Sequence, residues 1–181
     1  MRRRVYARMV GIFAGSVLLT AGVAEAQGIE RFYGSYVGEA LSQTGDELDK
    51  RDINAEIAPQ GNGFKMTFTV VVKRGKDKPR RDDYTIAFLP SQRPGIYSSA
   101  MRTDVFGNAV PKDPLVGDPY IWARLDGDRL WRYALFVTDT GGYEMQTYEY
   151  TLVAGGLNLR FSRIRDGEVL RTVTGKLKKA R

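Results

Sequence analysis

The side chains that most often carry chemistry in proteins are missing from this chain. Its 181 residues include no histidine and no cysteine. Without an imidazole there is no base for a catalytic triad of the Ser-His-Asp kind, and zinc or iron sites built on histidine or cysteine are excluded as well. Any catalysis would therefore have to rest on carboxylates or tyrosines.

The carboxylates show no arrangement that favours a reaction or a metal site. Asp82 and Asp83 are adjacent, so on a strand they point to opposite faces and cannot share a proton. The segment Asp126-Gly127-Asp128 is explained by a tight turn. The aspartates of the loop from Thr103 to Asp118 are nine and five residues apart, too far for a calcium loop. We therefore predict no catalytic residue, no metal ion, no cofactor and no enzyme activity.

Aromatic side chains are more informative, because several share one face of a predicted strand. Phe68 lies on the apolar face of the segment 64–73, and Trp131 and Tyr133 share one face of the segment 129–137. Phe161 follows Leu157 and Leu159 at period two in the segment 157–165. We predict Phe68, Trp131, Tyr133 and Phe161 as the ligand-binding residues of a cavity. The alternative is that these residues only fill a core.

Charged residues within strand patterns give a second indication. Arg124 follows Tyr120 and Trp122 on one face, and Glu149 follows Tyr143 and Met145. An ionic group that faces inward must be paired or must serve a ligand. A twist that brings the charge to the rim of the fold explains the pattern equally well.

The elements that must position these residues are β-strands. Period-two alternation, bounded by glycine, proline and aspartate turns, predicts nine or ten strands. They are expected at 33–40, 53–57, 64–73, 83–89, 96–101, 120–125, 129–137, 143–153, 157–165 and 169–177. Most connections have two to five residues, so sequential neighbours should pair antiparallel. The fold class is therefore all-β, an up-and-down meander that closes into a barrel of eight to ten strands, with a sandwich as the alternative.

The N-terminal residues have the composition of an export signal. Four arginines at positions 2, 3, 4 and 8 precede an apolar run of about 16 residues and then Ala24-Glu25-Ala26. The run is short of the roughly 20 residues that span a bilayer, which favours cleavage after Ala26 over a membrane anchor. We predict a signal peptide at 1–26, a single barrel domain at 27–181 and a periplasmic location. The general secretory route is preferred, and a twin-arginine signal is the alternative.

The charge of the chain argues against nucleic-acid binding. The net charge of +7 (28 basic and 21 acidic residues) becomes +4 (24 and 20) without residues 1–26, and Lys176, Lys178, Lys179 and Arg181 account for that remainder. The body of the domain is therefore neutral, whereas nucleic-acid binding needs a basic face. The basic C-terminus is interpreted as a solvated end, and weak contact with anionic lipid head groups is the second interpretation. The absence of cysteine means that no disulfide stabilises the domain.

Two short segments resemble the lipocalins, a family of small-ligand barrels. Phe32-Tyr33-Gly34-Ser35-Tyr36 is similar to the Gly-x-Trp segment with which that family opens its first strand, with Tyr36 in place of tryptophan. Thr138-Asp139 is similar to the Thr-Asp of its second motif, although the following residues depart from it. The resemblance implies a lipocalin-like barrel, and it supports the fold more than the function.

These observations predict a periplasmic barrel that binds a small apolar or amphipathic ligand. The alternative is a non-catalytic structural or interaction protein of the bacterial envelope with a filled core. An outer-membrane barrel is disfavoured, because its lipid-facing strands should be free of charge. The strands of this chain instead contain Lys65, Arg132, Arg160 and Arg171.

Overall fold

The computed structural model describes residues 28–72, 79–99, 101–103, 109–110 and 112–180. The predicted signal peptide, residues 1–26, lies outside them. Among the helices in this part of the chain, none has the length and apolar character needed to cross a membrane.

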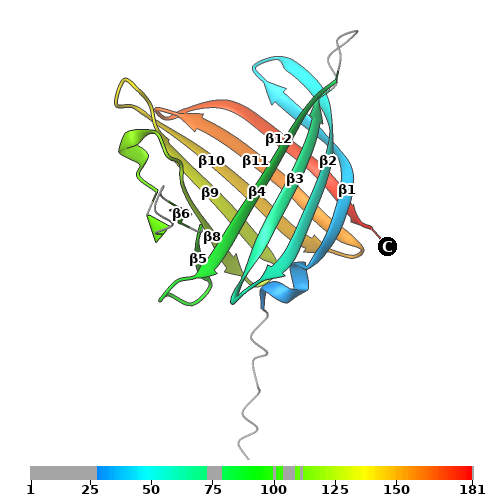
Figure 1. Cartoon of the computed structure of the whole chain (residues 1–181). Coiled ribbons are helices and arrows are strands. Elements are labelled where there is room, and N and C mark those ends of the chain that lie inside the picture. The colour runs from blue at the N-terminus through cyan, green and yellow to red at the C-terminus, as the bar shows by residue number, and fades with distance from the viewer. Residues whose placement is uncertain (1–27, 73–78, 100, 104–108, 111, 181) are drawn as a thin grey trace, which may run out of the picture.

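Ten antiparallel strands form a closed barrel (Figure 1). In barrel order they are β1 (Gly34–Thr44), β12 (Glu168–Lys179), β11 (Gly156–Arg165), β10 (Tyr143–Val153), β9 (Arg129–Val137), β8 (Tyr120–Asp126), β5 (Ile96–Ser99), β4 (Arg80–Pro90), β3 (Gly63–Val72) and β2 (Glu47–Gln60). The short strands β6 (Arg102–Thr103) and β7 (Ala109–Val110) form a separate hairpin between β5 and β8. The predicted all-β meander barrel is confirmed, and the sandwich is excluded.

Tight turns set the registers that decide which residues face the interior. Asp166 and Gly167 connect β11 to β12 with φ angles of 48° and 90°, the left-handed conformation that a two-residue hairpin requires. Asp166 is the one residue other than glycine with a positive φ in the described part of the chain. Aspartate tolerates this conformation better than most side chains, which explains the Asp-Gly pair at this turn.

The alternation predicted for β3 is present in the structure. Phe64, Met66, Phe68 and Val72 are buried, whereas Lys65 and Thr67 face outward and are only partly covered. The predicted register of this strand is therefore confirmed.

One end of the barrel is closed by the 3₁₀ helix η1 (Ile29–Phe32), which lies beneath β1 in Figure 1. Ile29 and Phe32 are buried, and the Tyr36 hydroxyl donates a hydrogen bond of 2.8 Å to the Phe32 carbonyl oxygen. An ion pair of 2.6 Å joins Arg31 to Asp128 in the β8–β9 turn. The helix thus covers the lower opening with apolar side chains and fastens to the barrel at its edge.

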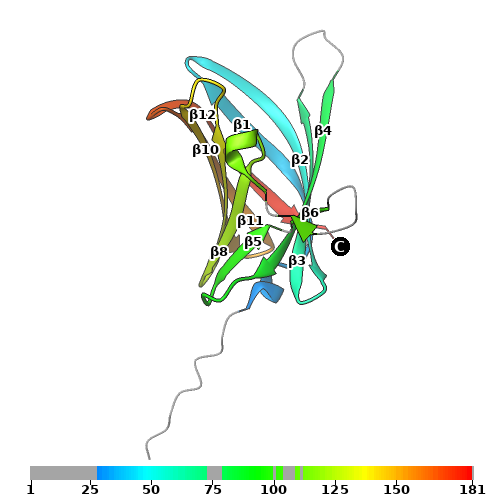
Figure 2. The same cartoon turned by 60° about the vertical axis from the view of Figure 1, so that its left-hand side comes forward.

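The barrel wall is least complete at β5, because this strand has only four residues. β5 pairs with β4 at Phe88, Leu89 and Pro90 and with β8 from Trp122 to Arg124. The remainder of β4, residues 80–87, has a strand partner on one side only, β3, among the described residues. Figure 2 shows β4 and β8 diverging above β5. The upper part of the barrel is therefore less completely enclosed than the lower part.

Candidate functional site

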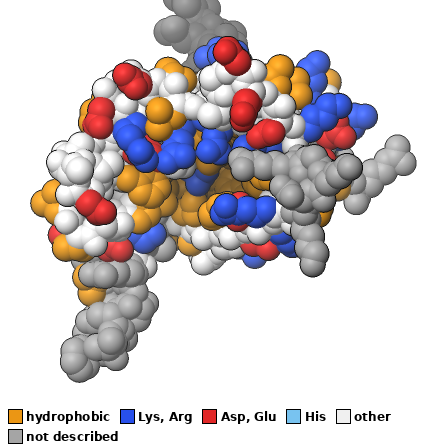
Figure 3. Space-filling model, turned by 90° about the horizontal axis from the view of Figure 1, so that it is seen from above, with side chains coloured by type: hydrophobic (Ala, Val, Ile, Leu, Met, Phe, Trp, Pro, Cys, Tyr) orange, Lys and Arg blue, Asp and Glu red, His pale blue; other side chains and the backbone are white. Residues whose placement is uncertain are grey.

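A cavity of about 610 Å³ occupies the interior at the upper end of the barrel. Its wall comes from β2, β3, β4, β8, β9, β10, β11 and β12, and it includes residues of β4 that face both inward and outward. A deeper space of about 50 Å³ continues it towards Phe68 and Tyr150. Figure 3, which looks down from above, shows hydrophobic side chains within the hollow and lysine or arginine side chains around its edge.

The cavity wall is mainly apolar. Its aliphatic and aromatic members are Ile53, Val70, Tyr84, Ile86, Ile121, Ala134, Phe136, Tyr148, Leu159, Phe161 and Val173. The volume lies within the range of small-molecule sites, which are typically lined by apolar groups with a few polar ones among them. The polar groups of this wall are therefore the ones that would orient a guest.

Arg132 is the most deeply placed of these polar groups. It is 8% exposed, and its guanidinium carbon lies 3.6 Å from the centre of the Tyr148 ring and 5.1 Å from that of Phe68. Two aromatic faces at this range stabilise the cation, since their quadrupoles attract it. Its Nε is buried without a hydrogen-bond acceptor, and Arg132 forms no ion pair with a carboxylate in the described part of the chain. A buried guanidinium in this state retains donors for a further partner.

Arg171 on β12 lines the same cavity in a similar state. Its Nε is also buried without an acceptor, and no carboxylate pairs with it among the residues that the structure describes. The two carboxylates on the wall, Asp82 and Asp83, pair with arginines of their own strand. Asp82 lies 3.0 Å from Arg80, and Asp83 lies 2.9 Å from Arg81 and hydrogen-bonds Thr69. Because Arg80 and Arg81 neutralise these aspartates, the charge that the wall presents to a guest is positive.

Two further arginines at the upper end are paired, in contrast to Arg132 and Arg171. Glu144 is 6% exposed, and its Oε2 accepts hydrogen bonds from Arg163 at 2.6 Å and from Arg165 at 2.9 Å. Gln146 donates a third bond, 2.9 Å long, to Oε1. Burial raises the pKa of the Glu144 carboxyl, but the bonds from Arg163, Gln146 and Arg165 outweigh it and lower the pKa to about 2. Glu144 is therefore ionised at neutral pH and holds these two arginines together.

The tyrosines on the inner face are protonated donors and acceptors. Burial raises the pKa of the Tyr150 hydroxyl far above its ordinary value, and the nearby Arg132 guanidinium only partly offsets this. Burial also raises the pKa of Tyr84. Neither phenol is an activated base, because activation would require a lowered pKa.

The structure separates the four predicted ligand-binding residues into two pairs. Phe68 lines the deep end of the cavity and Phe161 its main part, and their role in ligand binding stays a prediction. Trp131 and Tyr133 lie on the outer face of β9, where the Tyr133 ring stacks on Trp122 at 4.8 Å and Arg124 lies over Trp131. The prediction that Trp131 and Tyr133 line the cavity is therefore wrong in orientation. The opposite face of β9, with Leu130, Arg132, Ala134 and Phe136, is the inner one.

The predicted inward charges also lie on the outside. Arg124 is exposed and pairs with Asp126 at 2.7 Å, and Glu149 lies on the outer face of β10. The charged residues on the inner face that sequence reasoning missed include Arg51, Arg132, Glu144, Arg163 and Arg171. The signal was present in β8: Ile121, Ala123 and Leu125 form a uniformly aliphatic face. Since Leu125 pairs with Leu130 across the β8–β9 turn, that face places Arg132 inside.

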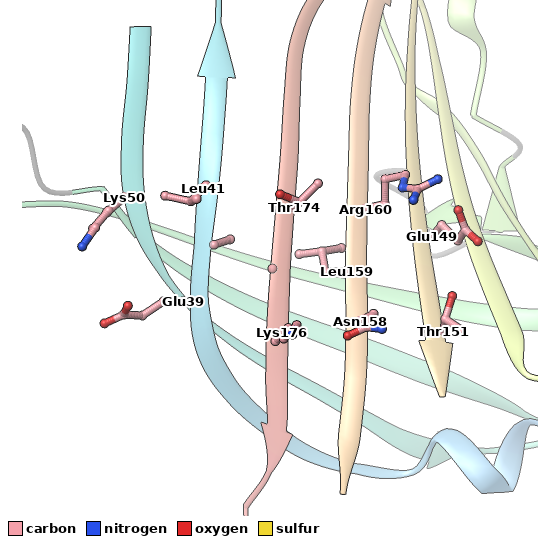
Figure 4. A pocket seen from close by; sticks show the side chains of 12 residues that line it. Glu39, Leu41, Lys50, Glu149, Thr151, Asn158, Leu159, Arg160, Thr174 and Lys176 are labelled. Carbon is pink, nitrogen blue, oxygen red and sulfur yellow. The ribbon is translucent and has the colours of Figure 1, made fainter. Parts of the chain in front are cut away.

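A second hollow, on the outer face of β1, β12, β11 and β10, has a volume of about 670 Å³. Figure 4 shows its labelled side chains spread along these strands rather than converging on one point. Glu39 and Lys176, two of its charged residues, are cross-strand neighbours of opposite sign, and Glu149 lies 3.9 Å from Arg129. Because the side chains of this hollow do not converge and the hollow is open to solvent, the interior cavity is the stronger candidate. No group of three or more potential metal ligands occurs among the described residues.

Comparison with known proteins identifies no family for this chain. No family model matches it, and no curated protein matches it. Among solved structures, it is similar to the S-type phycobiliprotein lyase of Guillardia theta, with 7% identity, 84% of this chain and 90% of the other covered, and a TM-score of 0.39. A putative outer membrane protein of Bacteroides fragilis (10% identity, coverage of 83% and 98%) has a TM-score of 0.21. An N-terminal dehydratase from the difficidin assembly line (9%, 82% and 79%) has a TM-score of 0.22.

These TM-scores are too low to carry an argument, so the fold rests on the strand pairings of the chain itself. The lipocalin resemblance holds at the level of an antiparallel meander barrel. Its two segments lie at opposite ends of that barrel: Tyr36 stands at the closed end beside η1, and Thr138-Asp139 follows β9 at the open end.

Proposed function

We propose that this protein binds a small apolar or amphipathic molecule inside its barrel. The observation that carries the proposal is the cavity of about 610 Å³, closed below by η1 and lined by apolar side chains from eight strands. A cavity of this kind counts against the alternative of a structural protein with a filled core, since interiors without a guest are normally packed to high density. The absence of histidine, cysteine and an activated phenol supports a carrier rather than an enzyme.

The test is saturable binding of the neutral apolar dye Nile red, read from the dye's own fluorescence. Intrinsic tryptophan fluorescence is a poor reporter, because Trp122 and Trp131 lie outside the cavity. Val70→Trp places a bulky ring in the cavity, and Val71→Trp places the same ring on the outer face of the same strand. We expect the first change to weaken binding by roughly tenfold or more, equivalent to about 1.4 kcal/mol, and the second to leave it unchanged. Equal effects, or no saturable binding, would contradict the proposal.

We further propose that the chain is exported to the periplasm and cleaved between Ala26 and Gln27. The support is the basic start, the apolar run and the Ala24-Glu25-Ala26 segment. N-terminal sequencing of the periplasmic product tests this directly, and a product that retains Met1 would refute it. Replacing Arg2 and Arg3 by lysine should preserve export by the general secretory route and abolish export by the twin-arginine route.

A further inference from the structure

Two arginines in the interior of the barrel have no carboxylate partner among the residues that the structure describes. Arg132 and Arg171 both line the cavity, both have a buried Nε without an acceptor, and neither pairs with a carboxylate in the described part of the chain. Removing a guanidinium from water is costly unless hydrogen bonds and an opposite charge compensate for it. The rings of Tyr148 and Phe68 stabilise the Arg132 cation, and its guanidinium hydrogen-bonds the Tyr150 hydroxyl, but none of these groups carries a compensating negative charge.

The neighbouring arginines show that the chain can supply such anions. Glu144 holds Arg163 and Arg165, while Asp82 and Asp83 are held by Arg80 and Arg81. Each of these carboxylates is therefore already bound to an arginine. Gln146 occupies the inner position next to Arg163, and it donates its amide to Glu144. Among the described residues, none of the carboxylates of the cavity wall is left to pair with Arg132 or Arg171. An anionic guest would supply the negative charge that these two arginines lack.

We propose that the ligand of this cavity is an amphipathic anion, whose oxyanion head is bound by Arg132 and Arg171 and whose apolar part lies against the surrounding aliphatic and aromatic wall. The inference rests on the proposed function and specifies the charge of the ligand. A planar guanidinium matches the two oxygens of a carboxylate or phosphate, and such charge-assisted bonds are among the stronger polar contacts in proteins. The apolar wall near the guanidinium raises their strength by excluding water.

The test compares three probes with the same alkyl chain: decanoate, decanol and decyltrimethylammonium, each measured by displacement of Nile red. We expect decanoate to bind at least about tenfold more tightly than decanol, a difference of about 1.4 kcal/mol, and the cation to bind most weakly. Decyl phosphate in place of decanoate distinguishes a phosphate head from a carboxylate head.

Single substitutions assign the effect to the two arginines. Arg171→Gln and Arg132→Gln should each lower the ratio of decanoate affinity to decanol affinity by roughly 10- to 100-fold, or about 1.4–2.8 kcal/mol. Arg160→Gln, on the outer face of β11, is the matched control and should leave the ratio unchanged. Because Arg132 is almost fully buried, Arg171→Gln provides the decisive variant if Arg132→Gln fails to fold.

The outcomes separate this inference from the proposed function. Equal binding of decanoate and decanol, or a ratio that neither arginine variant changes, would overturn the anion inference while leaving a ligand-binding barrel intact. Failure of every probe and of Nile red to bind would overturn the proposed function and the inference with it.

Discussion

The two ends of the barrel interior differ in their side chains: the closed end is packed with apolar groups, and the open end has a cavity beside charged groups. At the closed end, Phe32, Phe64, Phe88, Leu130 and Leu157 are 0% exposed. Phe64 stacks on Phe88 at 4.9 Å and meets Tyr97 edge-on at 5.1 Å. At the open end the interior has a cavity and several inward charged side chains, among them Arg132, Glu144 and Arg171. The comparison indicates that the lower half of the interior is a packed apolar core, whereas the upper half holds buried charged groups beside a cavity.

The largest expected effect tests the closed end. Phe64→Ala should lower the free energy of unfolding by about 3–5 kcal/mol, because it removes a fully buried ring and leaves a cavity that its neighbours cannot fill. Lys65→Ala, the next residue and on the outer face, should change it by less than about 0.5 kcal/mol. Urea denaturation measures both, and similar losses would show that the two faces of β3 do not differ as described.

The next effect concerns Glu144, which pairs with Arg163 and Arg165 at the open end. The pKa of Glu144 falls from 4.5 to about 2, which corresponds to at most about 3 kcal/mol of stability at neutral pH, and less where water at the rim screens the pair. Since the folded pKa is the lower one, this contribution is complete above about pH 4.5 and is lost as the pH falls towards 2.

Glu144→Gln should therefore destabilise the protein at pH 7 and progressively less at lower pH. Urea denaturation at pH 7, 4 and 3 measures the difference between wild type and variant. Glu168→Gln, an exposed position at the start of β12, is the control. A difference that is independent of pH would mean that the carboxylate charge is not what holds Arg163 and Arg165.

The aromatic rings stacked on the outside of the barrel, Trp122 and Tyr133, should contribute less to the free energy of unfolding than either interior region. Tyr133→Ala removes the ring stacked on Trp122 and should cost about 1 kcal/mol, with a change in near-ultraviolet circular dichroism from the tryptophan. Ligand affinity should stay the same, because Tyr133 lies outside the cavity. Reduced affinity of this variant would return Tyr133 to the binding site and would contradict the observed register of β9.

The fold was more predictable from sequence than the site, and β9 shows why. Alternation and tight turns predict where strands begin and pair, as they do for β3 and for the β8–β9 hairpin. In β9 both faces carry large side chains, so the apolar pattern does not say which face is inner. Trp131 and Tyr133 are the more apolar pair by composition, yet they cover the outside. A register shift of one residue exchanges the two faces of a strand, so a site prediction can fail on a strand that was itself predicted correctly.

Replacing Arg132 should have the smallest effect on stability, and it gives the sharpest test of the difference between the closed and the open end of the barrel. Arg132→Met replaces a buried cation by an unbranched apolar side chain of similar length, and so removes the cost of burying a charge without a carboxylate partner. It also removes the cation–π contacts with Tyr148 and Phe68, worth about 1–2 kcal/mol each at a nearly buried site. These terms oppose each other, so we expect the free energy of unfolding to stay within about 1 kcal/mol of wild type or to rise.

The matched comparison is Leu130→Ala, two residues before Arg132 on the same inner face of β9. Because Leu130 is fully buried, this change should lower the free energy of unfolding by about 2–5 kcal/mol. Urea denaturation of the ligand-free protein measures both variants. A loss above about 2 kcal/mol for Arg132→Met would mean that the arginine is a structural element of the upper barrel, satisfied by its aromatic neighbours. Stability near wild type would instead mean that the barrel gains nothing for its own folding from this buried charge, which is the behaviour expected of a residue kept for a ligand.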